Sequence, residues 1–243
     1  MIPEIHTHCV ARAMAFGEVT DSVSIVVDIL RASTTIITAL SNGARAVIPC
    51  KSIDEANTMA LNFSGTLRGG ERQGLPIPGF EYGNSPADYL ERPLSQQSVA
   101  FTTTNGTGAL LRCKEANRIF VGAFLNLSHL ALHLRSFERP LHIVCAGTDG
   151  KVTGEDILFA GALTRRILDN VRSSPTLNRA TVEALRSFDE DKNTPLVQRL
   201  QQTEGGRNLI QLGLKADIEF SSQIDSRPVL AEFLPRDNRI VRV

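Results

Sequence analysis

The 243-residue chain has no tryptophan, only two tyrosines and no excess of either charge. Lysine plus arginine number 26, and aspartate plus glutamate also number 26. Because the formal net charge is zero, no net field would concentrate nucleic acid or an anionic membrane around the chain. We therefore expect neither as a partner, and an anionic ligand has to be bound by local groups.

Cysteine is scarce and long apolar runs are absent. The four cysteines, Cys9, Cys50, Cys113 and Cys145, include no C-x-x-C pair that could bind zinc or carry out redox chemistry, so we expect reduced core residues. The apolar runs are far shorter than the ~18 residues of a membrane span, and no signal-peptide pattern opens the sequence. We expect a cytoplasmic protein, with a homo-oligomer left open.

Short β-branched runs alternate with longer helical patterns as far as about residue 170, which is typical of βαβ units. The predicted fold class is α/β, with three layers: a mainly parallel or mixed sheet and helices on both faces. Residues 1–243 are predicted to form one domain, with a more polar helical excursion at about 171–203. The predicted strands cover 23–28, 44–50, 66–68, 98–103, 118–121, 141–145, 228–234 and 239–243. The predicted helices cover 34–40, 52–62, 107–113, 128–136 and 154–169, with a short one from Pro86.

Polar segments follow several of these strands, and ligands of open parallel sheets bind outside the carboxyl ends of the strands. Asp28 comes directly after the first apolar strand, and Arg31 follows in the same segment. An aspartate there can hold a metal, and an arginine can present its fork to a phosphate or carboxylate. The alternative is an Asp28–Arg31 ion pair that only stabilises the turn.

Two further segments are rich in small and polar residues. In Gly69-Gly70-Glu71-Arg72 an acidic residue again adjoins an arginine, although a turn with exposed charges explains the pattern equally well. Residues 102–108 carry hydroxyl groups and glycines where a strand meets a helix, and backbone N–H groups there could bind an oxyanion. The alternative is a helix N-cap without a ligand, because neither a Walker motif nor a dinucleotide fingerprint is present.

A fourth polar segment, residues 146–150, precedes Glu155 and Asp156 in the first turn of a predicted helix. Acidic residues at this position either bind a metal or only complement the helix dipole. The histidines are less informative. His6 and His8 share one face of a strand, and His129 and His133 lack the glutamate of a zinc-protease motif, so we interpret all four as structural or surface residues.

Together these segments resemble the magnesium-dependent 2-phosphosulfolactate phosphatase family. The resemblance rests on residues 26–35, on Gly70-Glu71-Arg72 with Gly74, and on 79–86, 103–107, 147–150 and 155–156. It spans about residues 24–225, and the motifs are specific only in combination. Two positions depart from the family pattern: Ser33 stands where threonine is expected, and Glu81 stands where aspartate is commoner.

The resemblance implies a similar α/β fold, a Mg²⁺ requirement and hydrolysis of the phosphate ester of 2-phospho-3-sulfolactate on the route to coenzyme M. The substrate would be a small phosphorylated anion, and a metal with local arginines suits such a ligand. Carried onto this sequence, the catalytic residues are Asp28, Arg31 and Arg72. The metal ligands are Asp28, Glu71 and Asp156. The substrate-binding residues are Asn84, Thr104, Asn105, Gly106, Thr107 and Asp149.

Three alternatives stay open. Asp28 could be a phosphate-accepting nucleophile as in haloacid-dehalogenase-type phosphatases, but their second aspartate is replaced by Leu30 here, so metal-activated water is favoured. A phosphatase, transferase or isomerase acting on another phosphorylated small hydroxy acid would use the same segments. A non-catalytic anion-binding protein would bind the ligand without turnover.

Overall fold

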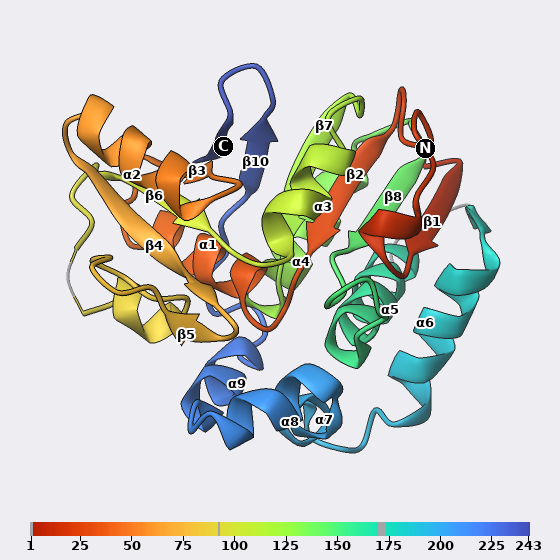
Figure 1. Cartoon of the computed structure of the whole chain (residues 1–243). Coiled ribbons are helices and arrows are strands. Elements are labelled where there is room, and N and C mark those ends of the chain that lie inside the picture. Colours follow the sequence, from red (N-terminus) through yellow and green to blue (C-terminus); the bar gives the residue numbers. More distant parts are fainter. Residues whose placement is uncertain (1, 92, 170–173) are drawn as a thin grey trace.

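A computed structural model describes residues 2–91, 93–169 and 174–243. Its strands form one mixed sheet with the order β5-β4-β6-β3-β11-β10-β7-β2-β8-β1-β9 (Figure 1). The strands are β1 Glu4–His8, β2 Val23–Val27, β3 Ala46–Pro49, β4 Thr66–Arg72, β5 Leu75–Pro76, β6 Ser98–Thr102, β7 Arg118–Gly122, β8 Leu141–Cys145, β9 Thr176–Leu177, β10 Ala231–Leu234 and β11 Arg239–Arg242. The α-helices are α1 Ala32–Ser41, α2 Ile53–Asn62, α3 Gly106–Arg112, α4 Leu127–Leu134, α5 Gly154–Leu168, α6 Arg179–Glu190, α7 Leu196–Gln202, α8 Glu204–Gln211 and α9 Lys215–Ser221.

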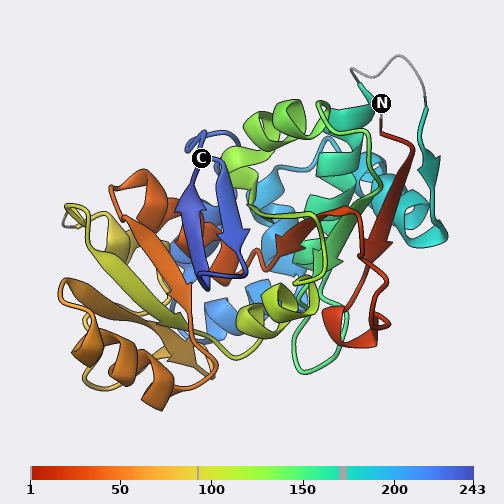
Figure 2. The same ribbon diagram turned by 90° about the horizontal axis from the view of Figure 1, so that it is seen from above.

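The sheet consists of two parallel halves joined by the C-terminal hairpin. In the first half β4, β6 and β3 run parallel, and in the second half β7, β2, β8, β1 and β9 do. The antiparallel β10–β11 hairpin lies between the halves, as Figure 2 shows from above. It joins β3 through one residue pair, Ile240 with Val47, and β7 through two. The predicted three-layer α/β class is confirmed, and the antiparallel hairpin makes the sheet mixed.

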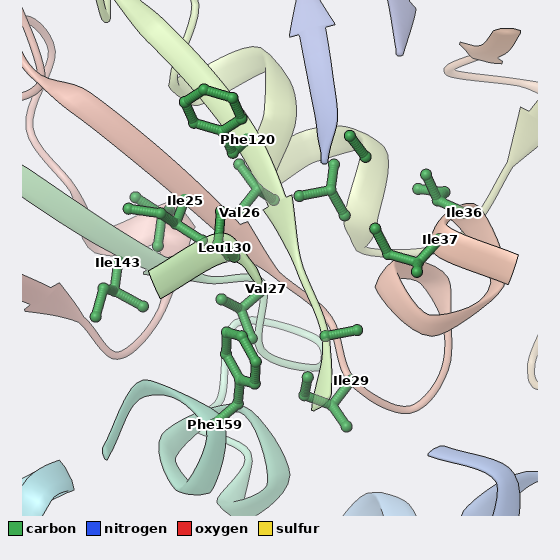
Figure 3. Packing of buried hydrophobic residues seen from close by; sticks show 14 of the residues in the cluster. Ile25, Val26, Val27, Ile29, Ile36, Ile37, Phe120, Leu130, Ile143 and Phe159 are labelled. Atoms are coloured by element: carbon green, nitrogen blue, oxygen red, sulfur yellow. The ribbon is translucent and has the colours of Figure 1, made fainter. Parts of the chain in front are cut away.

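The core is centred on β2, whose five residues are all buried. A strand with parallel neighbours and helices on both faces needs a near-continuous apolar segment, and Val23–Val27, which is apolar except at Ser24, supplies one. In Figure 3, Phe159 of α5 and Ile37 of α1 lie close to the carboxyl end of this strand. The residues that follow β2 are therefore attached to a fully buried strand of the core.

The predicted end of the strand at residue 68 is wrong, because β4 extends to Arg72. Gly69 and Gly70 therefore lie in a strand and not in a loop. The reason is close packing: β4 pairs with β6 as far as Gly70 opposite Thr102, and a Cβ atom at Gly70 would overlap the Thr102 carbonyl. The φ angle of Gly70, +137°, also favours glycine.

The C-terminal helices complete the fold. The predicted helical excursion at 171–203 begins with residues 171–173, which lie outside the described residues; it then contains the short strand β9, which pairs with β1 and was not predicted, and continues as α6 and α7. Helix α6 packs on α5, where Gly161 leaves room for the Ala184 carbonyl. Helices α7, α8 and α9 lie below both halves of the sheet in Figure 1. No helix in the described ranges is long and apolar enough to cross a membrane, and the cytoplasmic location stays a prediction.

Candidate active site

A cleft of about 690 Å³ lies where the carboxyl ends of β2, β4 and β6 approach helix α8. It brings together segments that are far apart in the sequence. The lining residues are Asp28, Leu30, Arg31, Glu71, Gln73, Gly74, Asn84, Thr103, Thr104, Asn105, Thr148, Asp149, Glu204, Gly205, Arg207, Asn208, Leu209 and Gln211. All four polar segments singled out in the sequence therefore contribute to one cavity.

Asp28 follows β2 and lines the cleft with a carboxylate that is only partly satisfied. Its backbone N–H donates to Ser33 Oγ at 2.9 Å, and its Oδ1 accepts a long 3.4 Å hydrogen bond from the Ala32 N–H. Its Oδ2 accepts no hydrogen bond from any described residue. Burial raises the pKa of Asp28 to about 7; the Ala32 N–H opposes this shift, and the charges of Glu71 and Glu155 reinforce it. Asp28 therefore changes its charge near neutral pH.

Arg31 is buried and fixed by partners from distant segments. Its Nη1 donates to Asp217 Oδ2 of α9 at 2.7 Å, and its Nη2 donates to the Gly74 carbonyl at 2.5 Å. Ser85 Oγ donates to the other Asp217 oxygen, Oδ1, at 2.5 Å. The ion pair of Arg31 is thus with Asp217, so the alternative of a turn stabilised by an Asp28–Arg31 pair is wrong. The guanidinium lines the cleft in a fixed orientation.

Glu71 and Arg72 differ in position although they are neighbours in β4. Glu71 Oε1 accepts hydrogen bonds from both the N–H and the hydroxyl of Thr104, and its Oε2 accepts one from the Gly74 N–H. It therefore ties the end of β4 to the segment after β6. Arg72 donates to the Glu71 carbonyl and to Thr102 Oγ1 and is not among the residues that line the cleft.

Two buried polar atoms of cleft-lining residues have no hydrogen-bond partner in the described part of the chain: Asn84 Oδ1 and Thr103 Oγ1. The two residues are 5% and 7% exposed. Thr103 lies beside Asp28, since a Cβ atom at Gly106 would lie 3.0 Å from Asp28 Oδ2 and 3.2 Å from Thr103 Oγ1. Buried polar atoms are normally paired, so these unpaired oxygens indicate a place where a ligand binds.

The other predicted substrate-binding residues surround this point. Asn105 Oδ1 accepts a 3.3 Å hydrogen bond from the Asp149 N–H, and both residues line the cleft. Thr107 instead donates its hydroxyl to the Cys50 carbonyl at 3.3 Å. With Gly106 it borders a small apolar pocket that also reaches Asp28. Thr107 thus helps to anchor helix α3 next to the cleft.

Asp156 is buried away from the cleft. Its Oδ1 accepts a hydrogen bond from the Ile29 N–H at 2.9 Å and its Oδ2 from the Gly147 N–H at 3.2 Å. Burial, Asp28 and Glu155 raise the pKa of Asp156 well above its usual value. The structure does not bring Asp28, Glu71 and Asp156 together as one group, since no cluster of three acidic, histidine or cysteine ligands occurs within the described ranges, and the metal requirement stays a prediction. The oxygens of Glu71 accept hydrogen bonds from Thr104 and Gly74, and those of Asp156 accept from two backbone N–H groups.

Sequence reasoning missed the wall that α8 supplies. Arg207, Asn208 and Gln211 line the cleft from this helix, and all three are exposed. The local signal was present, because the N-cap Thr203 accepts a hydrogen bond from the Gly206 N–H and marks the start of a helix. Nothing local indicates that this helix faces Asp28.

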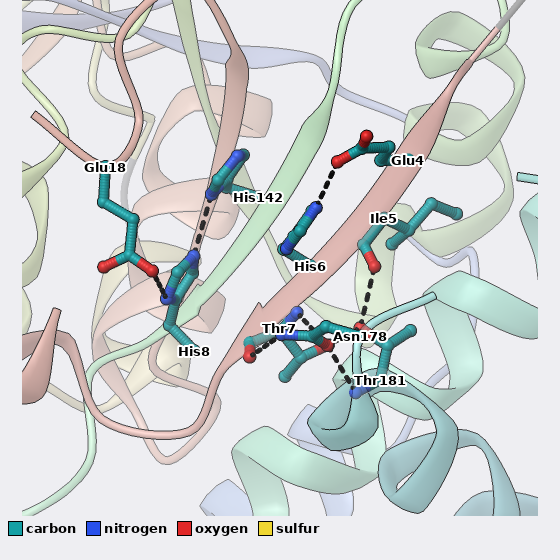
Figure 4. A network of polar contacts seen from close by, with 9 residues as sticks. All are labelled: Glu4, Ile5, His6, Thr7, His8, Glu18, His142, Asn178 and Thr181. Atoms are coloured by element: carbon teal, nitrogen blue, oxygen red, sulfur yellow. Dashed lines mark hydrogen bonds and ion pairs between the residues drawn. The ribbon is translucent and has the colours of Figure 1, made fainter. Parts of the chain in front are cut away.

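The histidines lie elsewhere. Figure 4 shows His6 and His8 of β1 beside His142 of β8, and stacking places the His142 ring centroid 5.0 Å from each of the other two. His8 Nε2 lies 2.8 Å from His142 Nδ1, and His6 Nε2 lies 2.7 Å from Glu4 Oε2. These contacts agree with the interpretation of His6 and His8 as structural residues.

Comparison with known proteins connects this geometry to one family. The model of the 2-phosphosulpholactate phosphatase family matches residues 10–234. Proteins named probable 2-phosphosulfolactate phosphatase are similar to the chain: 37% identical over 222 residues in Caldicellulosiruptor saccharolyticus, covering 88% of this chain and 89% of that protein. In Thermotoga petrophila the identity is 39% over 202 residues, covering 83% and 85%. Because the match includes every segment that lines the cleft, the chain belongs to the 2-phosphosulpholactate phosphatase family.

Proposed function

We propose that this chain hydrolyses 2-phospho-3-sulfolactate to 3-sulfolactate and phosphate, and that the reaction requires Mg²⁺. Family membership and the names of the relatives support the substrate. The observation that carries the proposal is that the cleft combines unpaired oxygens of Asn84 and Thr103 with the carboxylate of Asp28 and the fixed guanidinium of Arg31. The acceptor oxygens suit a cation, and the guanidinium suits phosphate oxygens.

The charge balance of the cleft supports the metal. Four acidic side chains line it, Asp28, Glu71, Asp149 and Glu204, against the two arginines Arg31 and Arg207. A substrate with phosphate, carboxylate and sulfonate groups adds several negative charges. A divalent cation would offset this excess, and Mg²⁺ is usually bound by one or two carboxylates together with phosphate oxygens.

The residues present fit such a cation. Asp28 and Asn84 would hold it, because Oδ2 of Asp28 and Oδ1 of Asn84 are oxygen acceptors that receive no hydrogen bond from the described residues. When bound, Mg²⁺ would polarise a phosphoryl oxygen and lower the pKa of a bound water. This assignment replaces the predicted trio, since Glu71 and Asp156 position loops instead.

The remaining residues bind and orient the substrate. Arg31 would donate to phosphate oxygens with the N–H groups that Asp217 and Gly74 leave unused. Residues 105–107 place backbone N–H groups at the start of α3, and the missing side chain of Gly106 leaves room for a ligand beside Asp28 and Thr103, while Thr104 is held by Glu71. A water oxygen would then attack phosphorus while the bond from phosphorus to the ester oxygen breaks, and a proton of that water would pass to the ester oxygen, which leaves as the hydroxyl group of 3-sulfolactate.

The test is a phosphate-release assay with 2-phospho-3-sulfolactate and related phosphorylated hydroxy acids, with and without Mg²⁺. We expect release from the sulfonated substrate in Mg²⁺ and its loss after EDTA treatment, with recovery on adding Mg²⁺. Full activity after exhaustive metal removal would contradict the metal requirement. Binding without release would instead favour an anion-binding protein, and transfer of the phosphoryl group to an added acceptor would favour a transferase.

A second measurement separates the two hydrolytic routes. In the route through Asp28 as nucleophile, acid quenching during turnover of labelled substrate traps a phosphoenzyme. In the favoured route through water, no labelled protein is recovered while phosphate accumulates at the steady-state rate. The assay thus tests the mechanism independently of substrate identity.

A further inference from the structure

Three side chains of α8 present unused hydrogen-bond donors to the cleft: Arg207, Asn208 and Gln211. We call them the α8 patch. Residues 207 and 211 are four apart and residues 208 and 211 are three apart, so all three lie on neighbouring positions of one helical face. Arg207 donates to the Gln202 carbonyl, which leaves most of its five N–H groups available.

Helix α8 is held firmly at both ends. Near its N-terminus, Gly205 lies directly against Glu155 of α5, and Thr203 caps the helix. Beyond its C-terminus, Leu212 packs on Gly74, the residue whose carbonyl binds Arg31. The helix therefore connects the second half of the sheet, through α5, with the β4–β5 turn of the first half. The α8 patch is consequently a fixed wall of the cleft.

Arg207 differs from Arg31, the other arginine that lines the cleft, in having no acidic partner among the described residues. The charge of Arg31 is already balanced by Asp217 at 2.7 Å. Arg207 forms no ion pair with any residue in the described ranges, and it is exposed at the cleft. It is therefore the lining residue best able to balance a second anionic group of a ligand whose phosphate lies near Asp28.

We propose that Arg207, with Asn208 and Gln211, binds the sulfonate of the substrate and so determines specificity for sulfonated over unsubstituted phosphorylated acids. This inference rests on the proposed function. A sulfonate is always ionised at physiological pH and offers three acceptor oxygens, which matches one guanidinium flanked by two amide groups. The carboxylate and phosphate remain for Arg31 and the segment 104–107.

The test compares Arg207→Gln with the wild type on two substrates that differ only in the sulfonate: 2-phospho-3-sulfolactate and 2-phospholactate. Charge-assisted hydrogen bonds are strong enough that we expect kcat/KM for the sulfonated substrate to fall about tenfold or more, mainly through KM. For 2-phospholactate we expect a change of less than about twofold. The matched control is Arg186→Gln on α6, which removes an exposed arginine paired with Glu190 on the same helix. This control should leave both substrates unaffected.

An equal loss on both substrates, or none on either, would overturn the role of Arg207. Failure of the proposed function gives a different result, because then the wild type releases phosphate from neither substrate. In that case calorimetry with 3-sulfolactate and lactate decides the inference. A preference of the wild type for 3-sulfolactate that disappears in Arg207→Gln supports it, and an unchanged or absent preference contradicts it. Unaltered melting temperatures of the variants confirm that both fold.

Discussion

The cleft at the carboxyl ends of β2, β4 and β6 and the histidine stack of β1 and β8 both gather titratable side chains, yet their hydrogen bonding differs. In the stack, His8 shares a hydrogen bond with His142, and its Nδ1 lies 3.7 Å from Glu18 Oε1. His6 shares a hydrogen bond with Glu4. In the cleft, buried oxygens of Asn84 and Thr103 and one oxygen of Asp28 have no partner among the described residues.

The comparison shows that a shifted pKa does not by itself identify a site. Burial lowers the pKa of His142 to about 4, with the neighbouring imidazoles adding to the shift. Burial likewise raises the pKa of Asp28 to about 7. The difference lies in what surrounds each group. The imidazole of His142 stacks on those of His6 and His8, whereas Asp28 lines an open cleft that also contains unpaired oxygens. We therefore expect substitutions in the two regions to affect different properties.

The largest effect is expected for Asp28→Asn. The amide keeps the volume of the side chain but removes the charge that would hold the cation or attack phosphorus. We therefore expect kcat to fall by several orders of magnitude, where each ~1.4 kcal/mol of lost transition-state stabilisation corresponds to a ~10-fold lower rate. Because the folded-state pKa of Asp28 is raised, ionisation destabilises the fold as pH rises through about 7. At pH 8 the variant should therefore melt at the same temperature or a few degrees higher. A folded variant with near wild-type kcat would remove Asp28 from the site.

A smaller effect is expected for Arg31→Lys, with Arg72→Lys as its matched comparison. Lysine cannot reproduce the planar fork that Arg31 shares between Asp217, Gly74 and the cleft, so we expect kcat/KM to fall by roughly 10- to 100-fold. Arg72 contacts Thr102 and a backbone carbonyl outside the cleft lining, and its substitution should cost less activity. Steady-state kinetics of the two purified variants measure the difference. Equal losses would return Arg72 to direct substrate binding.

The smallest effect on activity is expected for His142→Asn, which should leave kcat/KM unchanged. His142 has a lowered folded-state pKa, so its unfolded state binds protons first and wild-type stability falls as pH drops from 6.5 toward about 4. Without this imidazole, stability should fall less between pH 7 and 5, by roughly 1 kcal/mol after solvent screening, or about 2–4 °C in Tm. Melting curves at several pH values test this. A large loss of activity at pH 7.5 would contradict the distinction between the two regions.

Local sequence patterns were sufficient for much of the fold. The mostly apolar segment Val23–Val27 predicts a buried strand, and the capping residue Ser52 predicts the start of α2, where Ser52 Oγ accepts from the Glu55 N–H at 3.1 Å. The same patterns misplaced the end of β4, because the pairing of Gly70 with Thr102 is a contact between segments about thirty residues apart. Glycine content indicated a loop, whereas close packing required glycine within a strand.

The candidate site was predictable as a set of segments but not as an arrangement. Asp28, Thr104 and Asp149 follow strands and Glu71 lies near the carboxyl end of β4, and the general rule for parallel sheets places them in one cleft. The rule gives no information on which carboxylates remain free. Asp156 lies in the first turn of a helix after a polar segment, a position at which a metal ligand could occur. In the structure, however, its two oxygens accept hydrogen bonds from two backbone N–H groups.

The sequence by itself determined the alternation of strands and helices, the buried central strand and the polar segments that follow it. The tertiary structure decided that Arg31 pairs with Asp217, 186 residues away, and that α8 closes one side of the cleft with Arg207. The physical reason is that periodicity and capping act over a few neighbouring residues. Whether a buried charge or oxygen has a partner depends on distances between segments, which only the packed chain fixes.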